Sequence, residues 1–456
     1  MDDFNTAVGP HLLDGMHGQL QHLLDEARRQ GADACEARLL RRRSLYSTRV
    51  AGQSQSQSAK AGREFTVAVA VLLGQQKGLQ ITPAEDGKNF SETVAKALRQ
   101  AREAAPDPLV GLADAARMPT SVTDLALFHD WSFDPEAASA TVAACEQAAL
   151  ASDPRIVQVP SCYVVAQQNC EVYGNSHGFI GGYAGSTYQL TCVAKAAQAG
   201  SKRTCEKSLV QRTPAVLQAP ELIGRQAAER ALRLLGGRPV VEGDYPLICG
   251  PDAGTELLGG FLQAIQGGKV LAGQSFLAGC LGQTLFDQRI AIREYPSLPG
   301  GLGSIPFDAD GVTAMDQAFV EAGRLRGYAL NAETARGLNL TTTGNAVDNE
   351  LEIARNLTLE APALAYTALL ASVARGVLVD AVKPIQLDLA SGQFSLIGVG
   401  FWVEHGVIQH PLAPFVVSGN LKEAFAAISD VADDRPAYGR ICTGSWLIER
   451  LHVRPR

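Results

Sequence analysis

A serine in a pattern typical of hydrolytic nucleophiles is the first group that could do chemistry. Gly174-Asn175-Ser176-His177-Gly178 matches G-x-S-x-G, in which a sharp strand-to-helix turn exposes the serine hydroxyl. The run Cys170–Tyr173 predicts the strand before it, but residues 179–185 are too rich in glycine for the helix that must follow. We therefore interpret Ser176 as part of a hairpin turn and keep a self-sufficient serine hydrolase as the alternative.

The histidines do not form a metal-binding pattern. None lies between His177 and His405, whereas His405 and His410 flank a predicted hairpin with Glu404 beside them. A zinc site needs several ligands that converge from fixed positions, so we interpret this pair as a solvated turn. The eight histidines are His11, His17, His22, His129, His177, His405, His410 and His452.

The cysteines indicate a reducing environment. They are odd in number and contain no C-x-x-C pair, which predicts free thiols and a cytoplasmic location. Cys442, within Ile441–Ser445, is interpreted as a buried structural thiol. The nine cysteines are Cys35, Cys145, Cys162, Cys170, Cys192, Cys205, Cys249, Cys280 and Cys442.

Charge and hydropathy exclude some classes of partner. The chain has 456 residues and a net charge of −7, with acids and bases interspersed, which argues against nucleic acid or an anionic membrane as a partner. Met1–Phe4 lacks the basic and apolar regions of a signal peptide. The most apolar windows, Phe65–Leu73 and Ala361–Ala374, are shorter than the ~20 residues that span a bilayer. We expect a soluble protein of two or more domains.

The elements that would position these groups repeat in the first half of the chain. The order helix, strands, helix occurs twice. This repeat predicts an N-terminal α+β domain (1–240) made of two similar halves, with its boundary in Gly236–Asp244. Asn89 or Ser91 would cap the second helix, Asp134 the third, and Gln53–Ser58 would form a mobile hairpin tip. The predicted elements are Leu20–Gln30, Glu36–Val50, Phe65–Leu73 and Glu92–Ala104, then Asp134–Ser152, Ile156–Gln167, Cys170–Tyr173, Tyr188–Ala196, Thr204–Val210 and Pro220–Leu235.

The second half (241–456) predicts a turn-rich, mainly antiparallel β domain with a few helices. Asp-Gly and His-Gly dipeptides supply the positive φ that tight turns need. The elements with the clearest periodicity are a strand over Tyr245–Cys249, helices over Ala253–Gln266, Ala361–Arg375 and Leu421–Val431, and strands over Val377–Val382 and Ile441–Val453.

Four segments of this half carry a family resemblance. They are Phe307–Val312, Ala335–Asn345 with its Ala-Arg and Thr-Gly-Asn ends, Gly400–Gly406, and Ser418–Lys422. Their order and spacing resemble the C-terminal domain of the TldD/PmbA family, once called modulators of DNA gyrase, and most of all its PmbA (TldE) branch. The chain departs from that pattern where Asp310 replaces a Glu, His405 an Asn and Ser418 an Ala.

The resemblance raises the question of a zinc site. The active TldD branch resembles a zinc protease in which an H-E-x-x-x-H helix follows the opening strand and a cysteine is the third ligand. Aligned by strand, turn and Gly254, that window falls on Leu258-Gly259-Gly260-Phe261-Leu262-Gln263, so Leu258, Gly259 and Gln263 stand where ligands and base would be. Cys442 matches the third ligand, and nearby Glu256 is interpreted as a solvated residue. We predict no catalytic residue and no metal in this chain.

The resemblance then implies a function. We expect the non-catalytic TldE/PmbA-like subunit of a heterodimeric zinc metalloprotease, in which a TldD-like partner holds the zinc. Such complexes cleave small or unfolded peptides, as in leader removal during peptide natural product maturation or in antitoxin turnover. Besides the serine hydrolase, a non-enzymatic protein that binds gyrase stays open, as does a homodimer in place of the heterodimer. The sequence names neither the substrate nor any residue that contacts it.

Overall fold

We describe a computed structural model of the chain, covering residues 8–50, 58–83, 89–131, 134–347, 354–436 and 439–456. Most of the predicted hairpin tip at Gln53–Ser58 lies outside the described residues. The elements of the first half are α1 (Leu13–Arg29), β1 (Ala34–Val50), β2 (Ser58–Leu73), β3 (Gln76–Pro83), α2 (Phe90–Glu103), α3 (Pro135–Ala151), β4 (Ile156–Asn175), β5 (Ile180–Gln198), β6 (Ser201–Gln211) and α4 (Pro220–Arg233), with short 3-10 turns at Pro10–Leu12, Ala115–Arg117 and Pro214–Gln218.

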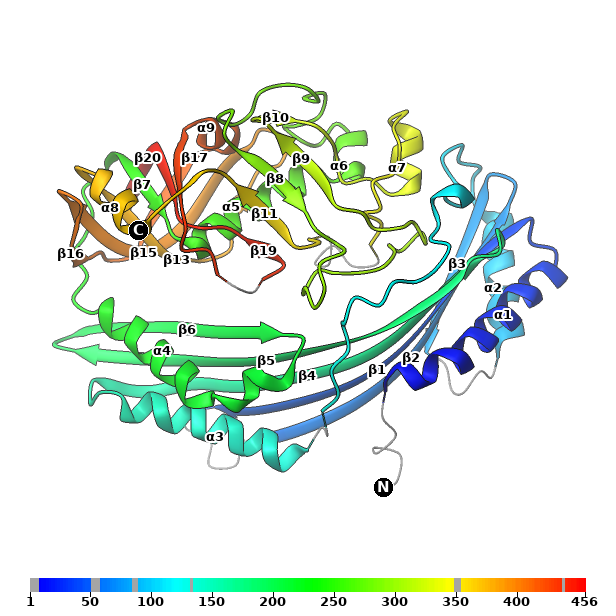
Figure 1. Cartoon of the computed structure of the whole chain (residues 1–456), viewed down its shortest axis with the longest axis horizontal. Helices are drawn as coiled ribbons and strands as arrows, with labels where there is room; N and C mark the ends of the chain where they lie inside the picture. The colour runs from blue at the N-terminus through cyan, green and yellow to red at the C-terminus, as the bar shows by residue number, and fades with distance from the viewer. Residues whose placement is uncertain (1–7, 51–57, 84–88, 132–133, 348–353, 437–438) are drawn as a thin grey trace.

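The two predicted halves share one antiparallel sheet. Its six strands run in the order β3-β2-β1-β4-β5-β6, so each half contributes three consecutive strands and the halves meet at β1 and β4. The long strands curve strongly, with α1 and α2 at one end of the sheet and α3 and α4 at the other (Figure 1). β3 and β6 are therefore the two edges of the sheet.

Helix packing against this sheet follows the apolar pattern of the sequence. α1 buries Leu20 and Leu23 completely, and α3 buries Val142 and Cys145. Asp134 begins α3 as predicted, because its carboxylate accepts the N–H of Glu136. Glycine permits two close approaches: a Cβ at Gly78 of β3 would lie 2.0 Å from the Ala97 carbonyl oxygen of α2, and one at Gly224 of α4 would lie 2.1 Å from that of Cys145.

The second half is mainly β. Its elements are β7 (Gly243–Cys249), α5 (Pro251–Ala264), α6 (Gly267–Leu271), β8 (Ala291–Glu294), β9 (Gln317–Glu321), β10 (Arg324–Leu325), α7 (Ala332–Gly337), β11 (Leu357–Glu360), β12 (Ala363–Leu364), α8 (Tyr366–Ser372), β13 (Arg375–Val382), β14 (Gln386–Leu387), β15 (Gln393–Glu404), β16 (Val407–Pro411), β17 (Phe415–Asn420), α9 (Leu421–Ala426), β18 (Ile428–Ala432), β19 (Ile441–Cys442) and β20 (Trp446–Pro455).

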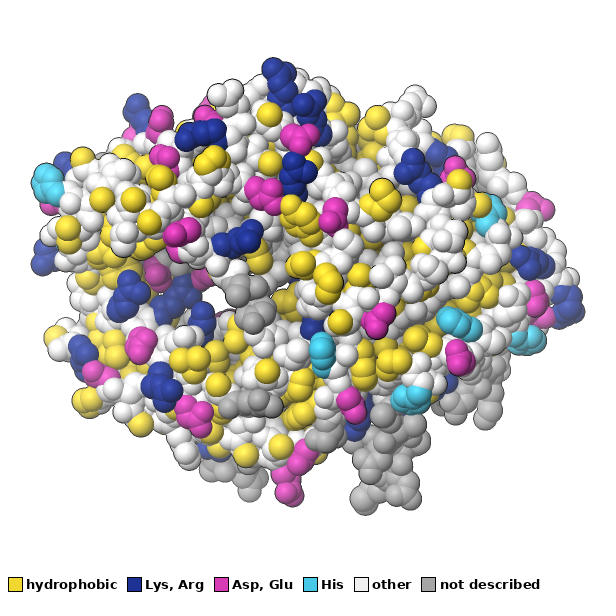
Figure 2. All heavy atoms as spheres, in the orientation of Figure 1, with side chains coloured by type: hydrophobic (Ala, Val, Ile, Leu, Met, Phe, Trp, Pro, Cys, Tyr) yellow, Lys and Arg dark blue, Asp and Glu magenta, His cyan; other side chains and the backbone are white. Residues whose placement is uncertain are grey.

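These strands form two sheets that lie over the concave side of the first (Figure 1). A smaller sheet has the order β10-β9-β8-β11-β19, and a larger one runs β12-β18-β20-β17-β15-β13-β7. Because β20 also pairs with β7, the path from β7 through β13, β15, β17 and β20 closes into a ring. Its core includes α5 residues such as Phe261 and strand residues such as Trp446. On the surface, the molecule is hollowed between its two parts, at the left of Figure 2.

Several predicted boundaries were wrong, each because a tertiary contact outweighed the local pattern. Ile156–Gln167 and Cys170–Tyr173 are one strand, since the polar Gln168 between them is buried and donates to Asp130 at 3.0 Å. Asn89 is the N-cap residue of α2, one of the two predicted, but with φ of 79° its side chain makes no cap hydrogen bond, and Ser91 lies inside the helix.

Two predicted helices of the second half are shorter than expected. Ala361–Arg375 is helical only over α8, which begins where the Asp433 carboxylate accepts the N–H of Tyr366 at 3.0 Å. Leu421–Val431 is helical only to Ala426, because Ile428–Ala432 pairs with β20 and buries Ile428. No helix of the described part of the chain is both long enough and apolar enough to cross a membrane.

Candidate functional site

The zinc-helix window expected from the resemblance lies on α5, directly after β7. Pro251 is the first residue of α5, a position where no helical hydrogen bond needs the N–H that proline lacks. Leu258 is fully buried in the core, a Cβ at Gly259 would meet open space, and Gln263 is exposed. The side chains of Leu258 and Gly259 carry no atom that can bind a metal ion, so the window offers at most the weak amide oxygen of Gln263.

Cys442 lies on β19, which packs against α5. A Cβ at Gly254 would come within 2.8 Å of Thr443 Cγ2, so α5 and the segment after Cys442 are in direct contact. The Cys442 thiol is half-buried rather than buried as predicted, and burial raises its pKa, which keeps it protonated. One protonated thiol with no imidazole from α5 does not fit a catalytic zinc ion, which takes three protein ligands.

A cleft of about 720 Å³ opens beside Cys442, between the end of β6 and the β8–β11–β19 edge of the smaller sheet. It is the candidate functional site, because it joins both parts of the molecule at the expected third-ligand position. Its lining residues are His129, Gln211, Arg212, Thr213, Tyr295, Leu298, Pro299, Gly300, Gly301, Leu302, Asn356, Thr358, Glu360, Arg435, Pro436, Gly439 and Cys442.

The polar groups of this cleft are largely engaged with one another. Tyr295 donates its hydroxyl to Glu360 at 2.5 Å, and burial together with this carboxylate raises the pKa of Tyr295 to about 12, so the phenol stays neutral. Arg212 donates to the carbonyls of Gly301 at 3.2 Å and Leu302 at 3.0 Å, which fixes the loop that forms one wall. These contacts give the cleft hydrogen-bonding walls.

Glu256, two residues before Leu258, is not the solvated residue that we predicted. It is half-buried, and its carboxylate accepts the N–H of Ile385 at 3.1 Å. A carboxylate on α5 thereby holds the segment that follows β13, which is a positioning role that the helical pattern alone could not indicate.

Ser176 lies in the tight turn between β4 and β5, and no helix follows it. Its Oγ accepts the N–H of Cys35 at 3.1 Å, and its own N–H donates to the Cys35 carbonyl at 2.8 Å. The hydroxyl therefore extends the pairing between this turn and the start of β1. His405 occupies the exposed β15–β16 turn with φ of 52°, and His410 lies on β16.

Three thiols that the sequence left scattered meet in the core of the first half. Cys162 and Cys192 are directly opposite on β4 and β5, Cys145 reaches them from α3, and their sulfur atoms lie within 4.8 Å of one another. All three are fully buried. They lie among the apolar side chains of that core, so we interpret the cluster as thiols that pack as small apolar side chains. In the described part of the chain, no other group of three His, Cys, Asp or Glu side chains has its ligand atoms this close.

Two of the four segments that carry the resemblance are in direct contact. The Asp308 carboxylate accepts the N–H groups of Asp310 at 3.0 Å, Val312 at 2.9 Å and Ala346 at 2.9 Å, which ties the Phe-Asp segment to the Thr-Gly-Asn segment. Asp310 accepts the N–H of Ala332 at 2.8 Å, at the start of α7. These hydrogen bonds therefore make a joint between the motif segments.

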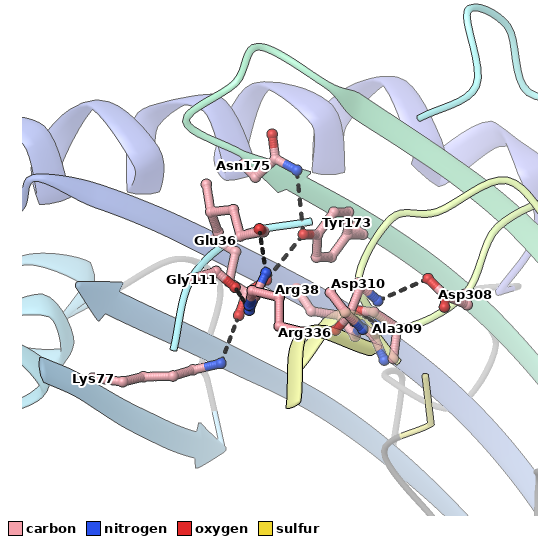
Figure 3. A network of polar contacts seen from close by, with 12 residues as sticks. Glu36, Arg38, Lys77, Gly111, Tyr173, Asn175, Asp308, Ala309, Asp310 and Arg336 are labelled. Carbon is pink, nitrogen blue, oxygen red and sulfur yellow. Dashed lines mark hydrogen bonds and ion pairs between the residues drawn. The ribbon is translucent and has the colours of Figure 1, made fainter. Parts of the chain in front are cut away.

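That joint contacts the first sheet through a half-buried polar network (Figure 3). Arg38 of β1 donates to the Ala309 carbonyl at 2.9 Å and pairs with Glu171 of β4 at 3.3 Å. Beside it, Glu36 accepts from Lys77 at 3.0 Å and from Tyr173 at 3.0 Å. The sequence signal was present in the motif spacing, but the strand residues that receive the loop carried no motif of their own.

Comparisons with known proteins agree with this architecture. Residues 242–455 match the PmbA/TldA metallopeptidase C-terminal domain, and residues 128–235 match the PmbA/TldA metallopeptidase central domain. The metalloprotease PmbA homolog of Haemophilus influenzae is 32% identical over 396 residues, 86% of each chain, and metalloprotease PmbA of Escherichia coli O157:H7 is 30% identical over 385 residues, 84% of each chain.

A solved structure shows the same fold. TldE from Thermococcus kodakarensis matches with a TM-score of 0.83 at 17% identity, over 96% of this chain and all of that one. The two sequence relatives match this chain over most of their own length, and the solved structure shares its fold. The chain belongs to the PmbA/TldD metallopeptidase family.

Proposed function

We propose that this chain is the non-catalytic subunit of a two-subunit zinc metalloprotease that cleaves small or unfolded peptides. A TldD-like partner would hold the zinc ion, and this chain would complete the wall of the reaction chamber and hold substrate. The observation that carries the proposal is the chemistry of the α5 window, where Leu258 belongs to the core and the helix has no imidazole to accompany Cys442. Packing can be retained where ligands are lost, because the two use different side chains.

The test compares the chain alone with the chain plus a TldD-like protein that carries H-E-x-x-x-H. We expect metal analysis of the purified chain to find much less than one zinc per chain, and we expect an unstructured peptide to stay intact. Adding the partner should start hydrolysis, and EDTA should stop it. Stoichiometric zinc in this chain, or cleavage by the chain alone that EDTA abolishes, contradicts the proposal.

Ser176→Ala separates this proposal from a serine hydrolase. The Ser176 hydroxyl already serves as an acceptor for the Cys35 N–H, so we expect its loss to lower the free energy of unfolding by about 1 kcal/mol and to leave partner-dependent cleavage unchanged. Hydrolysis by the wild-type chain in EDTA that disappears in Ser176→Ala would instead establish the hydrolase. Capture of gyrase in a pull-down that lacks any TldD-like protein would favour the binding alternative.

The remaining expectations from the sequence stay predictions. These are the domain boundary near residue 240, the cytoplasmic location, the absence of metal and catalytic residues, and a heterodimer rather than a homodimer. Size-exclusion chromatography with light scattering on the chain, the partner and their mixture would decide the last of them.

A further inference from the structure

A second cleft, of about 810 Å³, lies between β6 and the ring strands β13 and β15 of the other half. Its lining combines half-buried apolar side chains, Val382, Ile397 and Val399, with exposed charged ones such as Lys202 and Lys383. The residues that line it are Lys202, Arg203, Thr204, Cys205, Glu206, Lys207, Ser208, Arg230, Asp252, Ala381, Val382, Lys383, Pro384, Ile397, Val399, Pro414 and Arg456. None of them belongs to the candidate site described above.

The charge of this cleft is opposite to that of the chain. Six Lys and Arg side chains line it against two acidic ones, in a protein of net charge −7. Arg230 is already neutralised by Asp252 at 2.6 Å and Asp380 at 3.0 Å. Lys and Arg side chains gather around the hollow over β6 and α4 (Figure 2). Such a cleft concentrates anions although the whole protein repels them.

Three lysines carry much of this charge without an acidic partner. Lys202 and Lys383 are exposed and Lys207 is half-buried, and no salt bridge of any of the three is found among the described residues. Since they make no structural ion pair, their ammonium groups are available to a ligand. Their spread over β6 and the segment after β13 favours an extended ligand over a single small anion.

One strand, β6, contributes residues to the basic cleft and to the candidate site. β6 lines the basic cleft with Lys202–Ser208, and the residues at its far end, 211–213, line the first cleft. β6 is also an edge strand of the six-stranded sheet, and an extended chain lying beside an edge can follow it over its whole length. At about 3.3 Å per residue, the path from Lys202 to Thr213 has room for roughly ten residues of extended peptide.

We propose that the basic cleft binds an acidic, extended segment of the peptide substrate and leads the rest of that peptide toward the candidate site. This inference rests on the proposed function, because it names the substrate class of that complex. Carboxylates pair with the lysines of the cleft while apolar side chains contact Val382, Ile397 and Val399, a combination that suits peptide better than a uniformly charged polymer. The net charge of −7 opposes a long nucleic acid, whose phosphates would extend beyond the cleft.

Fluorescence anisotropy on the full chain tests the inference without any partner. The probe is a labelled, unstructured peptide in which Glu alternates with Ala, and the reference is the same peptide with Gln in place of Glu. We expect the Glu peptide to bind and its affinity to fall steeply as salt is added, because the contacts are ion pairs near the surface. Equal affinity for the Glu and Gln peptides overturns the proposal, as does a single-stranded DNA oligonucleotide that binds more tightly than the Glu peptide.

A charge-reversal pair locates the site. Lys202→Glu, Lys207→Glu and Lys383→Glu together should weaken binding of the Glu peptide by about tenfold or more. The control combines Lys96→Glu, Arg99→Glu and Arg102→Glu on α2, at the other end of the sheet, and changes the net charge equally. It should retain wild-type affinity to within about twofold. Equal losses in both variants overturn the proposal, provided that thermal melts show both to be folded.

The two proposals can fail separately. Binding of the acidic peptide by the chain alone requires no zinc and no partner, whereas the proposed function is measured by partner-dependent hydrolysis. If the complex cleaves Glu and Gln peptides with the same kcat/KM, the basic cleft is not part of the substrate path and only the further inference is lost. If the acidic peptide binds but no partner confers hydrolysis, the metalloprotease role is lost and the binding site remains.

Discussion

At the scale of single residues, buried carboxylates connect segments of the second half by accepting several hydrogen bonds each. Glu294 is fully buried and accepts hydrogen bonds from Asn345 at 2.8 Å, Gln317 at 2.9 Å and the Arg355 N–H at 3.1 Å. Burial still raises the pKa of Glu294 to about 7, and burial with the nearby Asp310 raises that of Asp308 to about 7. Both carboxyls therefore titrate near neutral pH.

The first prediction concerns the pH dependence that Glu294 creates. A carboxyl whose pKa is higher in the folded state stabilises the fold fully below its unfolded pKa, and this stability is lost as pH rises through about 7. The unfolding free energy of wild type relative to Glu294→Gln should fall by about 2 kcal/mol between about pH 5.5 and 8. Urea titrations measure it. Glu321→Gln, at an exposed position, should keep the wild-type profile, and a parallel profile for Glu294→Gln would contradict the assignment.

At the scale of elements, the close contact between α3 and α4 depends on a missing side chain. Gly224 of α4 lies over the Cys145 carbonyl, where a Cβ would approach the oxygen to 2.1 Å. The contact is backbone against backbone, so no rotamer change can relieve it. Gly18 of α1, by contrast, is exposed and has nothing within 4 Å of its would-be Cβ.

Gly224→Ala and Gly18→Ala should therefore have opposite effects. We expect the first to lower the unfolding free energy by about 2 kcal/mol or more, because α4 must move away from α3. We expect the second to raise it by about 0.5–1 kcal/mol, because alanine is the better helix former. Denaturant midpoints at equal slope measure both. If Gly224→Ala is as stable as wild type, α3 and α4 do not pack backbone against backbone at this point.

Elements were predictable from the sequence where a local signal was strong. Asp134 and Pro135 predicted the start of α3 because cap and proline act within one turn. The end of the Leu421–Val431 helix was not predictable from local periodicity, since Ile428 leaves the helix to pair with Ile448 of β20, beyond the reach of a helical pattern. The donors that surround Glu294 also come from distant segments, so the residues next to Glu294 in the sequence did not indicate that it is buried.

At the scale of the whole molecule, the segment between α2 and α3 joins both parts. Arg336, near the end of α7, donates to the carbonyls of Leu109 at 2.7 Å, Gly111 at 2.8 Å and Leu112 at 3.1 Å. Further along, the Leu125 carbonyl accepts the N–H of Gly300 at 2.7 Å. The candidate cleft therefore depends on contacts between the two parts of the molecule. The sequence predicted each part separately, but it did not predict how they pack against each other.

Arg336→Ala should loosen this joint. It leaves three carbonyls without their charged donor, so we expect the unfolding free energy to fall by about 2–3 kcal/mol. Hydrogen exchange should increase in peptides covering residues 105–117 and stay unchanged in β15. Arg450→Ala, which removes only an exposed pair with Asp244, should cost less than about 1 kcal/mol. Unchanged exchange at residues 105–117 would show that Arg336 does not hold the segment.

The ring formed by β7, β13, β15, β17 and β20 has a consequence for biosynthesis. As the polypeptide leaves the ribosome, β1 can pair with β2 and β4 with β5 soon after each pair has been translated, because the two strands of each hairpin are consecutive in the sequence. β7 is the first strand of the second half, and it can pair with β20 only after nearly all of that half has been translated. Leu247 and Ile248 stay unshielded on one side during that interval, so a nascent chain stalled before β20 is the form in most need of a chaperone.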